Sequence, residues 1–168
     1  CGVGFLAQIE GIKSHWVLKQ ALRGLECMEH RGGCGGDSDS GDGAGILCQI
    51  PWDYLKKVWD IANKISSNST GLGMVFMPNE YERRQNAKQI FEEEAIKLGL
   101  ESAGWRDVPV DESALGPLAK ENAPFIQQWL VRSSKEGNDL EALLFQLRRR
   151  IGKRAREVWE ERAIDLYI

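Results

Sequence analysis

The stretch CMEHRGGCGGDSDSGDGAGI, residues 27–46, is the part of the sequence on which the interpretation of the fold depends. Residues 30–45 hold seven glycines and predict a loop, because glycine adopts positive φ and permits close backbone approach. A helix over 14–29, capped by Ser14, is expected before this loop, and a buried strand over 46–50 after it. The loop lacks the Gly-Lys-Ser/Thr ending and leads into a strand, which disfavours a nucleotide-binding loop.

Outward from this stretch, short apolar runs predict strands, and apolar residues at helical spacing predict helices. Strands are expected over 1–9, 72–77, 104–110, 124–132 and 164–168. Helices are expected over 55–65, after Asn79 with Glu82 completing a capping box, and over 139–161, whereas 111–123 reads as a loop or one short helical turn. The sequence therefore predicts an α+β fold.

Composition narrows the class of protein. The chain has 168 residues, 42% apolar and 28% charged, which is typical of one globular domain or a piece of a larger one. Its net charge of −3, from 22 basic and 25 acidic residues, predicts no nucleic-acid partner and no attraction to an acidic membrane surface. It has no run of 18 apolar residues and no visible signal peptide. Its four cysteines are too few for a disulfide scaffold of this length, so we expect a reducing compartment and free thiols.

The first candidate for chemistry is Cys1, which places a thiol and an α-amine on one residue. The amine has an ordinary pKa near 8 and can serve as the base for its own thiol, which is a good nucleophile toward an amide carbonyl. Gly2 and Gly4 leave room for a ligand to approach. The alternative is that the cysteine is incidental, and the residues alone leave both interpretations open.

Two further candidates lie in or beside the loop. Arg31 suits a carboxylate or a backbone segment through its forked donors, although a solvated loop arginine is the alternative. The spacing of Cys27, His30 and Cys34 resembles half of a zinc site, but a second tight pair of ligands is missing. We therefore expect no metal. We expect Cys27 and Cys48 to be buried and unreactive, and no disulfide among the four cysteines.

Several segments carry a family resemblance. CGVGF at 1–5, the 27–46 stretch, GMVFMP at 73–78, GWRDVPV at 104–110 and PFIQQ at 124–128 resemble the glutamate synthases. In the same order, these segments are similar to the start of that family's N-terminal glutaminase domain. The Gly-Gly-Cys after Arg31 and the Asp-Ser before Gly-Asp-Gly are similar to the ferredoxin-dependent type.

The resemblance implies an N-terminal-nucleophile hydrolase fold, an αββα four-layer sandwich of which this chain is the N-terminal portion. Residues 1–168 would be the first part of a class II glutamine amidotransferase domain, with the rest of that domain and the flavin synthase domains absent. Cys1 would be the nucleophile that attacks the glutamine side-chain amide. Arg31 and Gly32 would bind substrate or position the site, so Arg31 is expected close to Cys1, with Val3 and Phe5 buried in a paired strand.

The resemblance also says what this chain lacks. The family uses a downstream Asn-Gly pair as its oxyanion hole, and no Asn-Gly occurs in this sequence. No cofactor is expected in this segment, whereas the parent protein would carry FMN and an iron–sulfur cluster. Its partners would be glutamine, the downstream synthase domain and ferredoxin. Its place would be the cytoplasm, or the plastid stroma in a photosynthetic eukaryote. The rival hypothesis is a non-catalytic structural or binding module, held by zinc at Cys27, His30 and Cys34.

Overall fold

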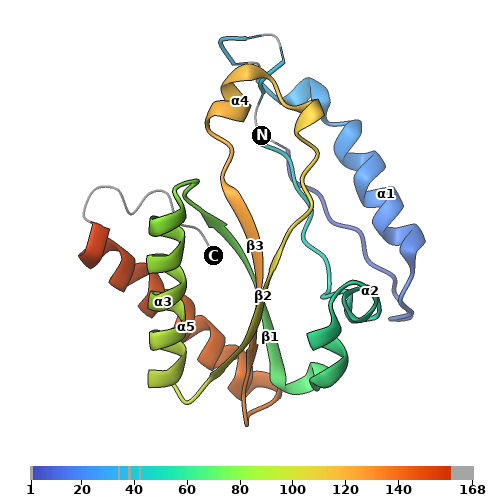
Figure 1. The fold of residues 1–168 in the computed structure, drawn as a ribbon. Coiled ribbons are helices and arrows are strands. Elements are labelled where there is room, and N and C mark those ends of the chain that lie inside the picture. The colour runs from blue at the N-terminus through green and yellow to red at the C-terminus, as the bar shows by residue number, and fades with distance from the viewer. Residues whose placement is uncertain (1, 34, 38, 42, 160–168) are drawn as a thin grey trace. The chain divides into compact units, whose positions relative to one another are not determined.

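A computed structural model describes residues 2–33, 35–37, 39–41 and 43–159 (Figure 1). The chain divides into two compact units, which are described separately. The first unit comprises Cys1–Ile50 and Asp111–Ala123, and the second comprises Pro51–Val110 and Pro124–Ile168. Among the described residues, no helix combines the length and apolar character that crossing a bilayer requires.

The second unit is built on an antiparallel sheet of three strands in the order β1-β3-β2. The strands are β1 (Thr70–Met77), β2 (Glu101–Asp107) and β3 (Phe125–Arg132). The central strand β3 pairs with both neighbours, so that Trp129 lies opposite Gly73 on one side and Trp105 on the other. Side chains alternate between the two faces of each strand, and the sheet therefore presents two apolar faces.

Helices α3 (Tyr81–Lys97) and α5 (Gly137–Trp159) cover one face of this sheet (Figure 1). The buried ring of Phe91 packs edge-on against Trp105 and Trp129, with centroids 5.4 and 5.1 Å away. The two indoles stack on each other at 5.2 Å. These three rings form the centre of the larger apolar core.

Glu94 joins the two covering helices. It is 4% exposed on α3, and its carboxylate accepts from Arg150 Nε of α5 at 2.7 Å and from Lys97 Nζ at 2.5 Å. Desolvation raises the pKa of Glu94, but the hydrogen bonds from Lys97 and Arg150 outweigh it and hold the pKa below its ordinary value. The buried charge is thus paired on both oxygens, as a carboxylate in an interior must be.

The other face of the sheet carries α2 (Trp52–Val58) and a short 3₁₀ helix (Asp60–Lys64). A smaller core forms here from the buried Leu55, Trp59, Ala62 and Leu130. Gly104 of β2 permits this close packing, because a Cβ built there would lie 2.7 Å from Ile61 Cδ1. Its φ of 154°, beside a register shift between Ser102 and Gly104, also favours glycine.

The first unit contains helices but no strand among its described residues. Its elements are α1 (His15–Glu26), α4 (Pro117–Glu121) and two 3₁₀ turns (Glu29–Arg31 and Glu112–Ala114). Ser14 caps α1 as predicted, its hydroxyl accepting from Trp16 N at 3.2 Å. No residue of α1, all of which is described, is buried.

The structure confirms the mixed α and β composition and most elements of the second unit. The strands predicted over 72–77, 104–110 and 124–132 and the helices predicted after Asn79 and over 139–161 are present, with shifted ends. Residues 111–123, predicted to form a loop or one short helical turn, contain a short 3₁₀ turn and the short helix α4. The helix predicted over 55–65 is broken at Trp59, which is extended and turns its ring into the smaller core. Glu80, not Asn79, is the N-cap of α3, and no side chain caps it.

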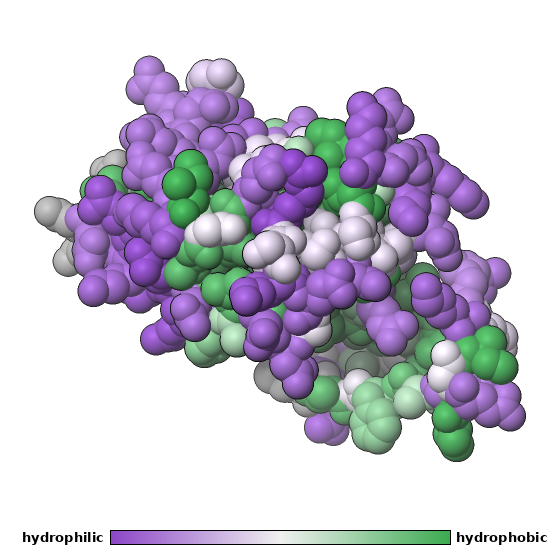
Figure 2. All heavy atoms as spheres, turned by 90° about the horizontal axis from the view of Figure 1, so that it is seen from below, coloured by the Kyte–Doolittle hydropathy of each residue, from purple (hydrophilic) through white to green (hydrophobic). Residues whose placement is uncertain are grey.

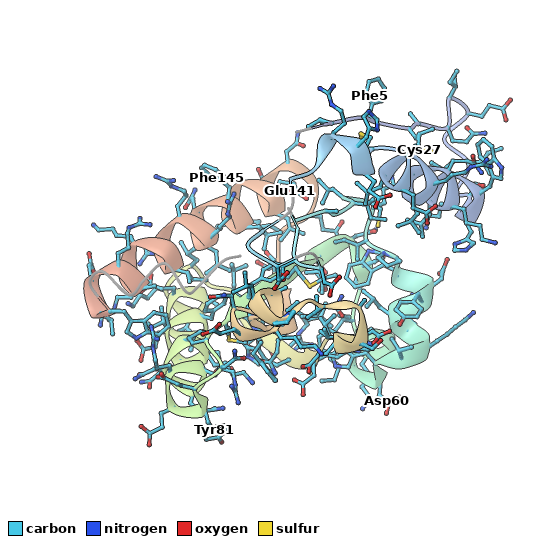
Figure 3. The ribbon with its side chains drawn as sticks, turned by 90° about the horizontal axis from the view of Figure 1, so that it is seen from above. Phe5, Cys27, Asp60, Tyr81, Glu141 and Phe145 are labelled. Carbon is cyan, nitrogen blue, oxygen red and sulfur yellow. The ribbon has the colours of Figure 1, made fainter. Side chains whose placement is uncertain are left out.

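Two predicted strands are wrong. Residues 2–9 and 46–50 form no strand, and Val3 and Phe5, predicted to be buried, are 98% and 94% exposed. A strand needs a neighbour for its backbone donors and acceptors, and within the described residues neither segment has one. Exposed apolar side chains are visible among the polar ones on the surface (Figure 2), and Phe5 and Phe145 project from the ribbon (Figure 3). The strand predicted over 164–168 lies outside the described residues.

The aromatic core yields a stability prediction. Phe91→Ala removes a fully buried ring with two aromatic neighbours and should lower the free energy of unfolding by about 3–5 kcal/mol. Phe145→Ala makes the same substitution at a 63% exposed position on α5 and should change it by less than about 0.5 kcal/mol. Denaturant titration measures both. Equal losses in the two variants would contradict the assigned core.

Candidate functional site

The turn that follows α1 sets the position of Arg31. Met28 N donates to Leu25 O at 3.0 Å, and Arg31 N donates to Met28 O at 2.8 Å. Gly32 N then donates to Glu29 O at 3.0 Å, which closes the 3₁₀ turn. These local bonds form a 3₁₀ turn that places Arg31 and Gly32 directly after the helix.

The N-terminal segment lies against this turn. A Cβ built on Gly2 would lie 2.9 Å from the Sδ of Met28 and 3.8 Å from Cβ and Cγ of Arg31. The backbone next to Cys1 is therefore in contact distance of the Arg31 side chain. Cys1 itself lies outside the described residues, so the expectation that Arg31 lies close to Cys1 stays a prediction.

The glycine-rich loop folds back on itself just after Gly32. Gly35 N donates to Ser40 O at 2.6 Å. A Cβ built on Gly41 would lie 3.2 Å from Gly33 O, so the two ends of the segment 33–41 run close together. We call this segment the acidic loop. Its glycines serve close backbone approach, as the sequence predicted.

Two side chains of the acidic loop cap α4, about eighty positions further along the chain. Asp37 Oδ2 accepts from Leu118 N at 3.0 Å, and Ser40 Oγ accepts from Ala119 N at 3.1 Å. The Ser40 hydroxyl in turn donates to Asp37 Oδ2 at 3.0 Å. These bonds satisfy two of the backbone donors that the first turn of a helix leaves without a partner.

Gly116, the N-cap of α4, makes this capping possible. A Cβ built there would lie 2.5 Å from Ser40 Oγ and 2.7 Å from both the carbonyl carbon of Asp39 and the backbone nitrogen of Ser40. Any larger residue would push the loop away from the helix. Gly116 itself has no side chain that could accept from the helix donors, so the acidic loop provides the acceptors.

Sequence reasoning missed this contact. It interpreted 30–45 as a loop and 111–123 as a loop or turn, and it assigned no role to Asp37, Ser40 or Gly116. The available signal was a helix start at Gly116-Pro117 without an adjacent Ser, Thr, Asp or Asn, which leaves its donors to be capped from elsewhere. Nothing in the sequence indicates which distant residues do so.

The expectations for the thiols are corrected in part. Cys27 and Cys48 are free, as predicted, but both are exposed rather than buried. Cys27 lies at the end of α1 (Figure 3), none of whose residues is fully buried, and Cys48 lies in the segment that forms no strand. Cys1 and Cys34 lie outside the described residues.

A zinc site finds no support in the described part of the chain. No three His, Cys, Asp or Glu side chains converge there on a point that could hold a metal ion. One ring nitrogen of His30, Nδ1, lies 3.0 Å from Cys27 O and donates to it in the matching tautomer. Of the zinc candidates, Cys34 lies outside the described residues.

The family match and two similar relatives agree on one family of proteins. All 168 residues match the family described as glutamine amidotransferases class-II. The chain is 45% identical over 165 residues to the ferredoxin-dependent glutamate synthase 1, chloroplastic/mitochondrial, of Arabidopsis thaliana, which covers 95% of this chain and 10% of that protein. It is 42% identical over 161 residues to the ferredoxin-dependent glutamate synthase 2 of Synechocystis sp., covering 94% of the chain and 10% of the relative. The chain thus spans about a tenth of the length of these relatives.

The capping contact predicts an abnormal titration of Asp37. The hydrogen bond from Leu118 N, with those from Ser40 and Asp39, holds the pKa of Asp37 below its ordinary value. The contact should therefore be intact above the ordinary aspartate pKa and be lost as the pH falls through the lowered one. An NMR titration of the Asp37 carboxyl carbon, with amide exchange at Leu118 and Ala119, measures both events. A midpoint at or above the ordinary value would contradict the contact.

Proposed function

Because the chain belongs to the class II glutamine amidotransferases, we propose that it forms part of the glutamine-hydrolysing site of a ferredoxin-dependent glutamate synthase. The relatives reported under this name match nine-tenths or more of the chain at 39–45% identity. The comparisons do not favour the rival hypothesis of a zinc-held structural module.

Cys1 is the proposed nucleophile. Its thiolate adds to the side-chain carbonyl of glutamine, and its own α-amine takes up the thiol proton. Collapse of the tetrahedral adduct breaks the C–N bond, and the returned proton lets ammonia leave. Water then hydrolyses the γ-glutamyl thioester to glutamate and restores the thiol. Each step needs only the two groups on residue 1, water and a stabiliser of the oxyanion.

Arg31 is the proposed partner of the substrate beside that nucleophile. The observation that supports this is the contact distance of 3.8 Å between a Cβ built on Gly2 and the Arg31 side chain. One peptide unit separates Gly2 from the thiol-bearing residue, so we expect the guanidinium to lie within reach of a ligand bound at Cys1. A guanidinium holds a carboxylate through two parallel bonds, which suits an amino-acid substrate. Gly32 leaves the adjacent backbone open to the same ligand.

The proposed architecture is the N-terminal portion of an αββα four-layer sandwich. The three-stranded antiparallel sheet with α3 and α5 on one face is compatible with one sheet and one helix layer of such a fold. The exposed apolar side chains of the first unit support further structure in the whole protein that covers them. Examples are Val3, Phe5 and Leu47, each more than nine-tenths exposed.

The synthase reaction is proposed for the rest of the parent protein. There the released ammonia would aminate 2-oxoglutarate, and FMN and an iron–sulfur cluster bound elsewhere in the parent protein would supply the redox chemistry. The residues described here do not fit an iron–sulfur cluster, since its ligands are converging cysteines and no such group occurs among them. The names of the Arabidopsis and rice relatives include "chloroplastic", which supports the plastid stroma if the chain comes from a photosynthetic eukaryote. For any other source the cytoplasm stays the proposal.

Cysteine substitution tests the nucleophile. Cys1→Ser in the full-length protein should abolish glutamine hydrolysis, because a hydroxyl is a far poorer nucleophile with the same weak base. Cys48→Ser makes the same change at an exposed free thiol and should leave ammonia release unchanged. Ammonia release from glutamine measures both. Retained hydrolysis in Cys1→Ser would exclude Cys1 as nucleophile.

The missing Asn-Gly pair predicts a separation of labelling from turnover. The isolated 168-residue chain should be alkylated slowly at Cys1 by a diazo-ketone analogue of glutamine, which needs only the thiol and a base. It should release negligible ammonia, since loss of one oxyanion donor alone lowers the rate by about 10²–10³. A longer chain that contains an Asn-Gly pair should restore hydrolysis. Substantial ammonia release by the short chain would place its oxyanion donors within residues 1–168.

A further inference from the structure

We propose that Asp37 and Ser40 are positioning residues of the glutaminase site: by capping α4 they hold the acidic loop, and through it the Arg31–Gly32 turn, in the conformation that binds glutamine. This inference rests on the proposed function. It assigns to the two side chains a role beyond loop stability, because the loop they hold begins immediately after the residues proposed to contact substrate.

Helix α4 needs acceptors for the backbone donors of its first turn. Pro117 has no backbone N–H, so Leu118 and Ala119 carry the first N–H groups of the helix that lack an acceptor within it. Asp37 accepts from one at 3.0 Å and Ser40 from the other at 3.1 Å. If the acidic loop moved away, both donors would lose their partners at once. The loop and the helix are therefore expected to move as one body.

Backbone contacts connect the acidic loop to the turn that carries Arg31. Ser40 O accepts from Gly35 N at 2.6 Å, and Gly41 closes on Gly33 O, so the tip and the ends of the loop are tied together. Gly33 follows Gly32 directly in the chain. A rotation of the loop about its ends changes the backbone at Gly32 first and the direction of the Arg31 side chain with it.

The carboxylate of glutamine requires an arginine whose direction is well defined. Glutamine presents a carboxylate, for which a guanidinium must be aimed to within a few tenths of an ångström to form both bonds. An arginine on a free loop would have to be ordered by the substrate, and that cost would appear as weaker binding. The cap supplies this order before the substrate arrives. The expected signature of its loss is a raised KM for glutamine rather than a lost nucleophile.

The test uses the full-length protein with Asp37→Asn and Ser40→Ala. Asp37→Asn keeps the shape but turns one acceptor oxygen into a donor, and Ser40→Ala removes the second cap. Each should raise the KM for glutamine by about tenfold, the size expected for loss of a charge-assisted hydrogen bond. The kcat should change by no more than about twofold. Labelling of Cys1 by the diazo-ketone analogue should slow in parallel, whereas labelling by iodoacetamide, which needs no arginine, should keep its rate.

Matched controls separate positioning from general damage. Glu121→Gln removes the same charge from the far end of α4, where the carboxylate is exposed, and should leave the KM unchanged. Gly116→Ala alters no hydrogen-bonding group but places a Cβ 2.5 Å from Ser40 Oγ, and it should reproduce the raised KM. Gly24→Ala, in α1 with no atom within 4 Å of the new Cβ, is its control and should have no effect.

The outcomes are distinguishable. A KM within twofold of the parent in Asp37→Asn and Gly116→Ala, together with a lowered melting temperature, would show that the cap only stabilises the fold and would overturn the inference. If Asp37→Asn does not fold, the KM for glutamine and the melting temperature of Ser40→Ala and Gly116→Ala decide between the two roles of the cap. Hydrolysis that survives Cys1→Ser would instead contradict the proposed function, whatever the Asp37 variants do.

Discussion

A helix that begins with Gly116-Pro117 cannot cap itself, and the organisation of the first unit follows from that constraint. Backbone donors at a helix start need acceptors, and an uncapped end costs about 1 kcal/mol. The acceptors come from Asp37 and Ser40, on a loop far away in sequence. The hydrogen bonds from Leu118 N and Ala119 N thus hold the acidic loop against α4. They also constrain where the chain that leaves α1 enters this loop.

The second unit is held together by a different principle, the alternation of side chains on a central strand. Trp129 enters the core under α3 and α5, where it stacks on Trp105 and donates through its indole nitrogen to Ser102 Oγ at 2.8 Å. Its neighbour Leu130 points to the opposite face and fills the smaller core beneath α2. Consecutive residues of β3 therefore anchor helices on both sides of one sheet, and the indole N–H groups of Trp105 and Trp129 both find an acceptor in the larger core.

Sequence patterns predicted this second unit well because its helices and strands form their backbone hydrogen bonds locally or within one sheet. Apolar periodicity alone indicated β1, β3, α3 and α5. It failed at residues 2–9 and 46–50, where an apolar run predicts a strand but cannot supply the neighbour that a strand needs. For the site, residue types suggested Arg31 and the glycines, whereas Asp37 and Ser40 act through a contact whose partner is about eighty positions away. Local pattern carries no information on such a pairing.

The distribution of indoles has a consequence for how this protein can be observed. Of its six tryptophans, all but Trp16 belong to the second unit, and Trp16 is 63% exposed. Intrinsic fluorescence will therefore report on the sheet and its helices and stay nearly silent while the acidic loop leaves α4. The stacked pair Trp105 and Trp129 adds an exciton signal in circular dichroism that belongs to the same unit. Optical melting curves will describe the scaffold, and events at the proposed site need a reporter of their own.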